Sequence, residues 1–112
     1  MPLIESLLEE CKRREVAEAH LSLCALLLMY ISVPRRGVAY LRTTAYRVPV
    51  QKLLDDITGL TGEDKRVLMQ KFMKAVGEAV AELKREIGGV ASAENLRRAL
   101  LRHLLEELRK LA

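Results

Sequence analysis

The sequence predicts an all-α protein, an elongated helical bundle of three long helices and one short helix. The first two of three observations behind this prediction are that apolar residues recur every three or four positions and that helix start and stop signals separate the periodic segments. Size is the third, because 112 residues, 50% of them hydrophobic, can bury one core but hardly two. We therefore expect a single helical domain over residues 1–112.

The first long helix is predicted over residues 3–32, either as one helix or as two joined near Arg13. Its second half, residues 21–33, is uncharged and apolar all round, which predicts burial in the bundle or under a partner subunit. This stretch is shorter than the roughly 20 residues that a membrane span needs, so a buried helix is favoured. Pro34 ends the helix.

An irregular basic arm, residues 33–48, is predicted between the first two helices. Its β-branched and aromatic residues favour a short strand or extended segment, and Gly37 and the flanking prolines disfavour a helix. A helical stripe is the alternative, formed by Val38, Leu41, Ala45 and Val48. Arg42 and Tyr46 share an exposed face in either case. Tyr40 joins them if the arm is extended, because residues two apart in a strand point the same way.

The remaining helices have clear boundaries. A short helix follows Pro49 and ends near Gly59. Thr61 is placed to cap a third helix over residues 62–87, which the glycines that follow it terminate. Ser92 is placed to cap the last helix, whose apolar stripe is Leu96, Leu100, Leu104, Leu108 and Leu111.

Two features of these helices suggest self-association. A helix of 26 residues is about 39 Å long, more than a compact domain of this size spans. Leu101 and Leu105 widen the apolar arc of the last helix beyond what two neighbouring helices would cover. Either a homodimer buries the remainder, or the basic arm folds over it.

The formal net charge of +4 arises in one part of the chain. Residues 19–54 contain five basic residues and no acidic one, whereas the rest of the chain is nearly balanced. The five are Arg35, Arg36, Arg42, Arg47 and Lys52. Such a surface attracts phosphates or acidic proteins; a solvated surface without a partner is the alternative.

The two cysteines are expected to be unpaired. Cys11 and Cys24 lie thirteen positions apart without a Cys-x-x-Cys or zinc-ligand pattern, so we expect no disulfide and a reducing compartment. Glu5, Glu9 and Glu10 interrupt the first apolar residues, which disfavours a secretory signal and indicates a cytoplasmic protein without a membrane role. The Arg-rich, amide-poor composition is typical of a thermophilic source.

No residue pattern indicates catalysis. His20 and His103 each lie within an apolar stripe, as core or interface histidines do, and a single His103-x-x-Glu106 does not make a di-metal site. The chain contains neither a Gly-x-Ser-x-Gly elbow nor a glycine-rich phosphate loop. We expect that the protein is not an enzyme and that it binds no metal, cofactor or small-molecule substrate.

The leading interpretation is a non-enzymatic nucleic-acid-binding accessory subunit for RNA or single strands. Arginines interleaved with tyrosines suit this function, because guanidinium groups bind phosphates and phenol rings stack on unpaired bases. The candidate residues are Arg35, Arg36, Tyr40, Arg42, Tyr46, Arg47 and Lys52. A competing interpretation has Arg35 and Arg36 at the carbonyl end of the first helix and the tyrosines covering the core. The alternative function is a scaffold that oligomerises or docks on an acidic protein.

Overall fold

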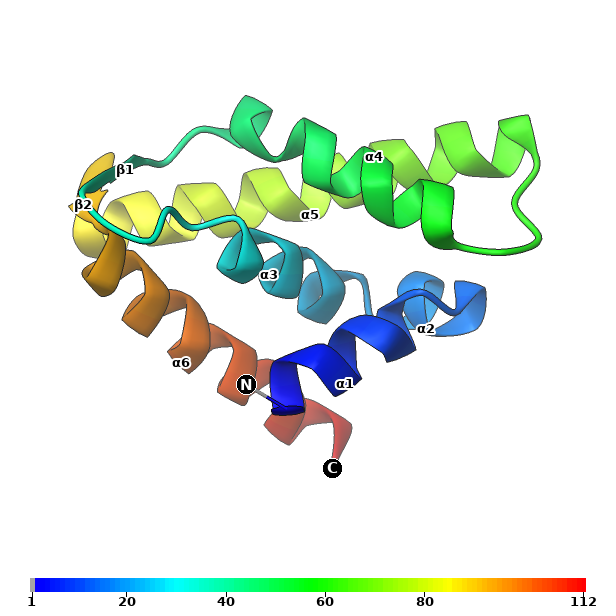
Figure 1. Cartoon of the computed structure of the whole chain (residues 1–112), viewed down its shortest axis with the longest axis horizontal. Helices are drawn as coiled ribbons and strands as arrows, with labels where there is room; N and C mark the ends of the chain where they lie inside the picture. The colour runs from blue at the N-terminus through cyan, green and yellow to red at the C-terminus, as the bar shows by residue number, and fades with distance from the viewer. Residues whose placement is uncertain (1) are drawn as a thin grey trace.

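Helices form most of the chain in the computed structural model, which describes residues 2–112 (Figure 1). The mainly helical fold predicted from the sequence is confirmed. In chain order the elements are α1 (Pro2–Cys11), α2 (Arg14–Ala19), α3 (Leu21–Ile31), β1 (Val38–Tyr40), the 3-10 helix η1 (Thr43–Tyr46), α4 (Arg47–Asp56), α5 (Gly62–Ile87), β2 (Val90–Ser92) and α6 (Ala93–Leu111).

The first predicted helix is in fact three helices. The chain leaves helical geometry after Cys11 and again at His20, whose φ of −124° and ψ of 52° lie outside the helical region. These two breaks let α1 turn back and pack against α3. The expectation of one helix, or of two joined near Arg13, missed the second break because apolar spacing continues across it.

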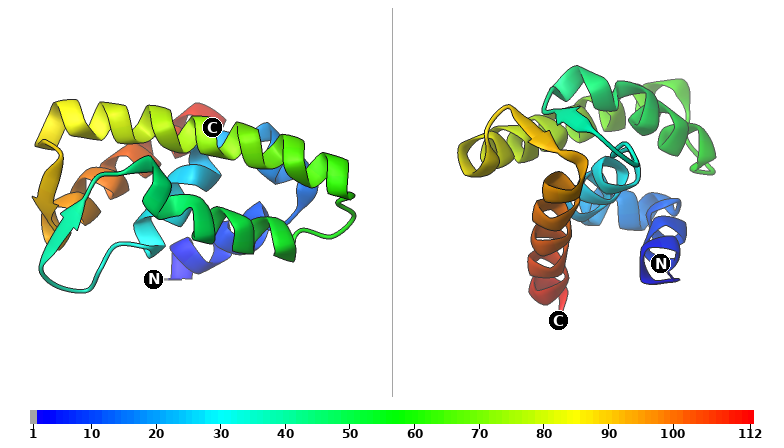
Figure 2. Two further views of the ribbon diagram at one scale, coloured as in Figure 1. Left: turned by 90° about the horizontal axis from the view of Figure 1, so that it is seen from above. Right: turned by 60° about the vertical axis from the view of Figure 1, so that its left-hand side comes forward.

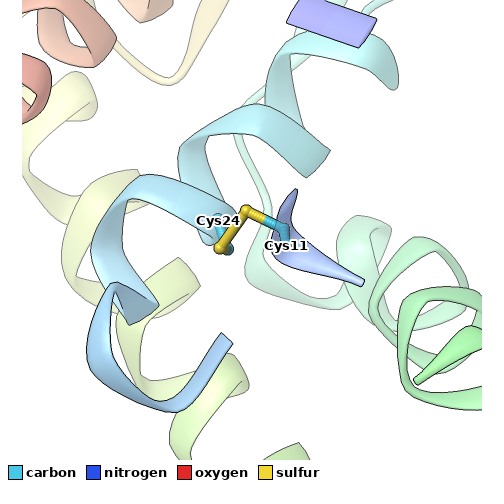
Figure 3. The surroundings of a disulfide bond; sticks show 2 residues. All are labelled: Cys11 and Cys24. Atoms are coloured by element: carbon cyan, nitrogen blue, oxygen red, sulfur yellow. A yellow bond between two sulfur atoms is a disulfide. The ribbon is translucent and has the colours of Figure 1, made fainter. Parts of the chain in front are cut away.

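This reversal pairs the two cysteines. Cys11 and Cys24 form a disulfide with their Cα atoms 5.8 Å apart (Figure 3). In one continuous helix the same residues would lie about 20 Å apart. The expectation of unpaired cysteines is therefore wrong. Disulfides persist in oxidising compartments and, inside cells, mainly in hyperthermophiles. The cysteines thus no longer argue for a reducing compartment.

Helix α3 forms the centre of the core. Every residue from Leu23 to Met29 is buried, and α3 packs against α1, α4, α5 and α6. The chain itself therefore covers residues 23–29 of the all-apolar segment, as the bundle interpretation predicted, while Ile31 near its end stays half exposed. Within residues 2–112 no helix combines the length and apolar character that crossing a membrane requires.

The long helices begin and end where the sequence indicated. The Oγ1 atom of Thr61 accepts a hydrogen bond from the Asp64 amide at 3.3 Å, and Ser92 Oγ accepts one from the Asn95 amide at 3.1 Å. Helix α5 ends at Gly88, which has a φ of +86° that favours glycine. Its length matches the longest dimension of the molecule, 38 Å, while the other dimensions are 29 and 22 Å. The radius of gyration of 13.5 Å is that of a compact domain, so the expectation of an elongated bundle is not met.

A two-stranded antiparallel ribbon joins two distant parts of the chain. β1 pairs with β2, with Val38 opposite Ser92, Ala39 opposite Ala91 and Tyr40 opposite Val90 (Figure 2). The predicted basic arm is therefore a strand at residues 38–40 and helical from residue 43 onward, so each of its two interpretations holds for one part. Its partner strand at residues 90–92 was not predicted.

Candidate nucleic-acid interface

The ribbon has one buried face and one exposed face. Ala39 points into the core, while Val38 and Tyr40 on either side of it are 56% and 58% exposed. Directly paired residues in an antiparallel ribbon share a face, so Val90, 53% exposed, lies beside Tyr40. We call the outward side chains of Val38, Tyr40, Val90 and Ser92 the ribbon face. It is a small, largely apolar platform.

Arg42 stacks on this platform. Its guanidinium carbon lies 5.4 Å from the centroid of the Tyr40 ring. The backbone of Arg42 is extended, with φ −132° and ψ 129°, so Arg42 and Tyr40 project to the same side, as the extended interpretation predicted. Such a cation–π contact contributes about 0.5–1 kcal/mol at an exposed site. The free protein thus already holds an aromatic ring and a planar cation together.

The loop that precedes the ribbon carries two more arginines. Arg97 of α6 donates hydrogen bonds from Nη1 to the Pro34 carbonyl at 2.6 Å and from Nη2 to the Arg35 carbonyl at 3.3 Å. These bonds hold the main chain of the loop against α6, and the Arg35 and Arg36 side chains remain exposed. With Arg97 they line a shallow cavity of about 310 Å³, and Glu94 stands at its edge.

The predicted basic residues form no ion pairs within residues 2–112. Arg35, Arg36, Arg42, Arg47 and Lys52 are all exposed, and none of them forms an ion pair with an acidic residue of the described chain. At the other end of the molecule, by contrast, Asp64 pairs with Arg14 at 3.0 Å. The charges of these five residues are therefore not neutralised by ion pairs within residues 2–112.

Tyr46 does not belong to this surface. Its side chain is only 5% exposed, because η1 packs against α5 and turns the ring inward. Burial raises the pKa of the Tyr46 hydroxyl above its ordinary value. The expectation that Tyr46 is exposed and shares a face with Arg42 is wrong. The core-covering interpretation holds for Tyr46 and does not hold for Tyr40.

The other two predicted residues extend along α4. Arg47 is the first residue of α4, directly after η1, and is exposed. Lys52 lies farther along and lines a groove with Lys12 of α1 and Asp56. The structure therefore brings Arg35, Arg36, Tyr40 and Arg42 together around the ribbon, leaves Arg47 at the margin and separates Lys52 from them.

Two basic residues near the ribbon were missed in the sequence. Lys84 and Arg85 belong to the last turn of α5, a few residues before β2, and both are exposed. They sit at the ribbon end because the double glycine, Gly88 and Gly89, leads α5 directly into β2. In the sequence the double glycine indicated that the helix ends after residue 87. Only the pairing of β2 with β1 places that end, with Lys84 and Arg85, at the ribbon.

His103 has a partner other than the one expected. Its Nε2 atom lies 2.9 Å from Glu86 Oε2 on α5, so its carboxylate partner is not Glu106 of its own helix, which the sequence places three residues away. Glu86 also forms an ion pair with Arg102, so the cluster ties α6 to α5. No group of three His, Cys, Asp or Glu side chains in residues 2–112 is arranged to hold a metal ion.

The chain matches no protein-family model, and no curated protein or solved structure shows significant similarity to it.

Proposed function

We propose that this protein is a non-enzymatic accessory subunit that binds RNA or single-stranded DNA through the ribbon face and the arginines around it. The observation that carries the proposal is the stack of Arg42 on the exposed Tyr40 ring at one end of β1. Arg35 and Arg36, in the loop before the other end of β1, form no ion pair with an acidic residue of the described chain. Single-strand-binding surfaces combine a positive groove with aromatic rings on which bases stack.

The roles of the residues follow from their chemistry. Arg35 and Arg36 would hold backbone phosphates, because a guanidinium presents paired donors to phosphate oxygens. Tyr40 would stack on an unpaired base, with Val38 and Val90 beside it as apolar support. Phosphate contacts carry no sequence information, so we expect little preference among base sequences.

Salt dependence tests this proposal directly. Binding of a fluorescent single-stranded oligonucleotide should weaken with salt with a log–log slope of about −0.7 for each phosphate contact, or about −3 for Arg35, Arg36, Arg42 and Arg47 together. The double variant Arg42→Glu/Arg47→Glu should bind all sequences more weakly and show a flatter slope.

Lys52 provides a control, because Lys52→Glu reverses one positive charge away from the ribbon, which is half the charge change of the double variant. Its slope should stay close to that of the wild type. If purified wild-type protein binds neither RNA nor DNA at low salt, where phosphate contacts are strongest, the nucleic-acid proposal is wrong.

A scaffold or assembly function is the second candidate. It is favoured by apolar side chains that the chain leaves uncovered on other helices: Ile31 is 47% exposed, Val48 66% and Leu105 44%. Purification separates the two candidates. Nucleic acid that leaves the protein at high salt favours the first, and a salt-indifferent oligomer free of nucleic acid favours the second.

A further inference from the structure

We infer that copies of this chain associate head to tail, with the C-terminal half of α6 of one copy seated in a groove between α1, α3 and α4 of the next. This inference rests on the assembly candidate and is independent of the nucleic-acid proposal. The groove encloses about 330 Å³. Leu28 and Leu53 form its floor, Ile31 and Val48 are largely exposed on its sides, and Lys52 and Asp56 stand on its α4 wall.

The C-terminal half of α6 is the complementary feature. Leu96, Leu100 and Leu104 are buried, but Leu105 and Leu111 farther along are 44% and 48% exposed. Leu101 and Leu108 beside them are only partly buried. This half of α6 is therefore an amphipathic helix whose apolar stripe is covered only in part by its own chain, and such helices bind apolar grooves in many complexes.

The charges beside the two apolar surfaces are complementary. Lys52 and Asp56 lie one turn apart on α4, in the order positive then negative. Glu106 and Arg109 lie about one turn apart on α6, in the order negative then positive. With α6 parallel to α4, Lys52 faces Glu106 and Asp56 faces Arg109, over axial separations of about 6 and 4.5 Å.

These side chains have little to bind within their own chain. Among residues 2–112, Lys52, Glu106 and Arg109 form no ion pair, and the partner of Asp56 is Lys12 at 4.0 Å. Arg109 follows Leu105 by about one turn and borders the stripe, and Glu106 lies about one turn before Arg109 on the same flank of α6. Both charged side chains can therefore lie on the side of α6 that faces α4. The match of charge order supports a second copy as the occupant of the groove.

The two surfaces lie on different sides of one molecule. Figure 2 shows the C-terminal end of α6 on one side and the elements of the groove, α1 and α4, on another. The helix therefore cannot enter the groove of its own chain. An interface between two different surfaces is heterologous, so repeated association produces a ring or an open filament instead of a closed pair.

The test measures molar mass by sedimentation over a range of concentrations. Wild-type protein should exceed the 12.7 kDa of one chain and grow with concentration. Val48→Asp in the groove and Leu105→Asp on α6 should each give monomers. Val67→Asp is the matched control, because Val67 is an exposed valine of α5 outside both surfaces, and it should assemble like the wild type.

Mixing the two blocked variants identifies the interface. Leu105→Asp retains an intact groove and Val48→Asp retains an intact helix, so an equal mixture should form a complex that stops at two chains, one of each kind. A two-chain product is specific to a heterologous contact between these two surfaces. Circular dichroism of each variant verifies that it is folded.

Charge reversal supplies a second test that leaves the apolar surfaces intact. Lys52→Glu should weaken association about tenfold or more, and adding Glu106→Lys in the same chain should restore it. If the wild type assembles but neither Leu105→Asp nor Val48→Asp reduces its mass, the groove inference is wrong and the assembly candidate stands. A wild-type mass of 12.7 kDa at every concentration would overturn both.

Discussion

Cys11, the last residue of α1, is joined by a disulfide to Cys24 in the first turn of α3, and both side chains are buried. The other buried side chain of α1 is that of Ile4. The disulfide is therefore a principal attachment of α1 to the core. It also fixes one wall of the groove between α1, α3 and α4.

Removal of the disulfide should destabilise the protein. A crosslink that closes a loop of this length stabilises the folded state by about 3 kcal/mol, mainly by restricting the unfolded chain. The double variant Cys11→Ser/Cys24→Ser should lose about 2–4 kcal/mol of unfolding free energy in a denaturant titration. A reductant should destabilise the wild type and leave the double variant unchanged. An unresponsive wild type would show that the cysteines are not paired.

The centre of the core should be sensitive to a cavity. Leu27 is 0% exposed in α3, so Leu27→Ala should lower the unfolding free energy by about 2–5 kcal/mol. Leu3→Ala makes the same chemical change at a residue 46% exposed on α1, and its cost should stay below about 1 kcal/mol. If thermal or denaturant unfolding showed that Leu27→Ala and Leu3→Ala lose the same amount of unfolding free energy, α3 could not be the centre of the core.

Two tyrosines should respond in opposite ways to truncation. Tyr40→Ala should weaken single-strand binding by about 1–3 kcal/mol, because a stacking ring is lost, and should leave stability nearly unchanged. Tyr46→Ala should cost about 3 kcal/mol or more of unfolding free energy, because its ring is buried. Binding titrations and denaturation of both variants test the pair. Tyr46→Phe preserves the packing, so if this variant lost single-strand binding, the Tyr46 hydroxyl would have to contact the nucleic acid.

Burial of Tyr46 also predicts a dependence of stability on alkaline pH. The folded-state pKa of its hydroxyl is raised above the unfolded value of about 10, so the folded protein holds the proton more tightly. Its contribution is fully present below about pH 10 and is lost as pH rises through the folded-state pKa. The stability difference between wild type and Tyr46→Phe should change over this window. A difference that stays constant across this window would contradict burial of the Tyr46 hydroxyl.

The sequence alone determined the features that depend on near neighbours. The caps at Thr61 and Ser92 act on amides three residues away, and Gly88 ends a helix through its own backbone conformation. The burial of α3 followed from its uncharged, all-apolar composition, which no solvent-exposed helix would favour. The cluster of uncompensated arginines was visible as a gap in acidic residues between positions 19 and 54.

The tertiary structure decided every feature that joins distant residues. The ribbon pairs Tyr40 with Val90 and the disulfide joins Cys11 to Cys24, and neither contact has a periodic or local signal. Tyr40 and Tyr46 have similar neighbours in the sequence, yet one ring is exposed on the ribbon and the other is buried against α5. That difference arises because the chain changes from strand to 3-10 helix between them, which alters the side to which successive side chains point. A change in direction of this kind depends on what the strand pairs with and what the helix packs against, so only the folded chain could assign the two tyrosines to different roles.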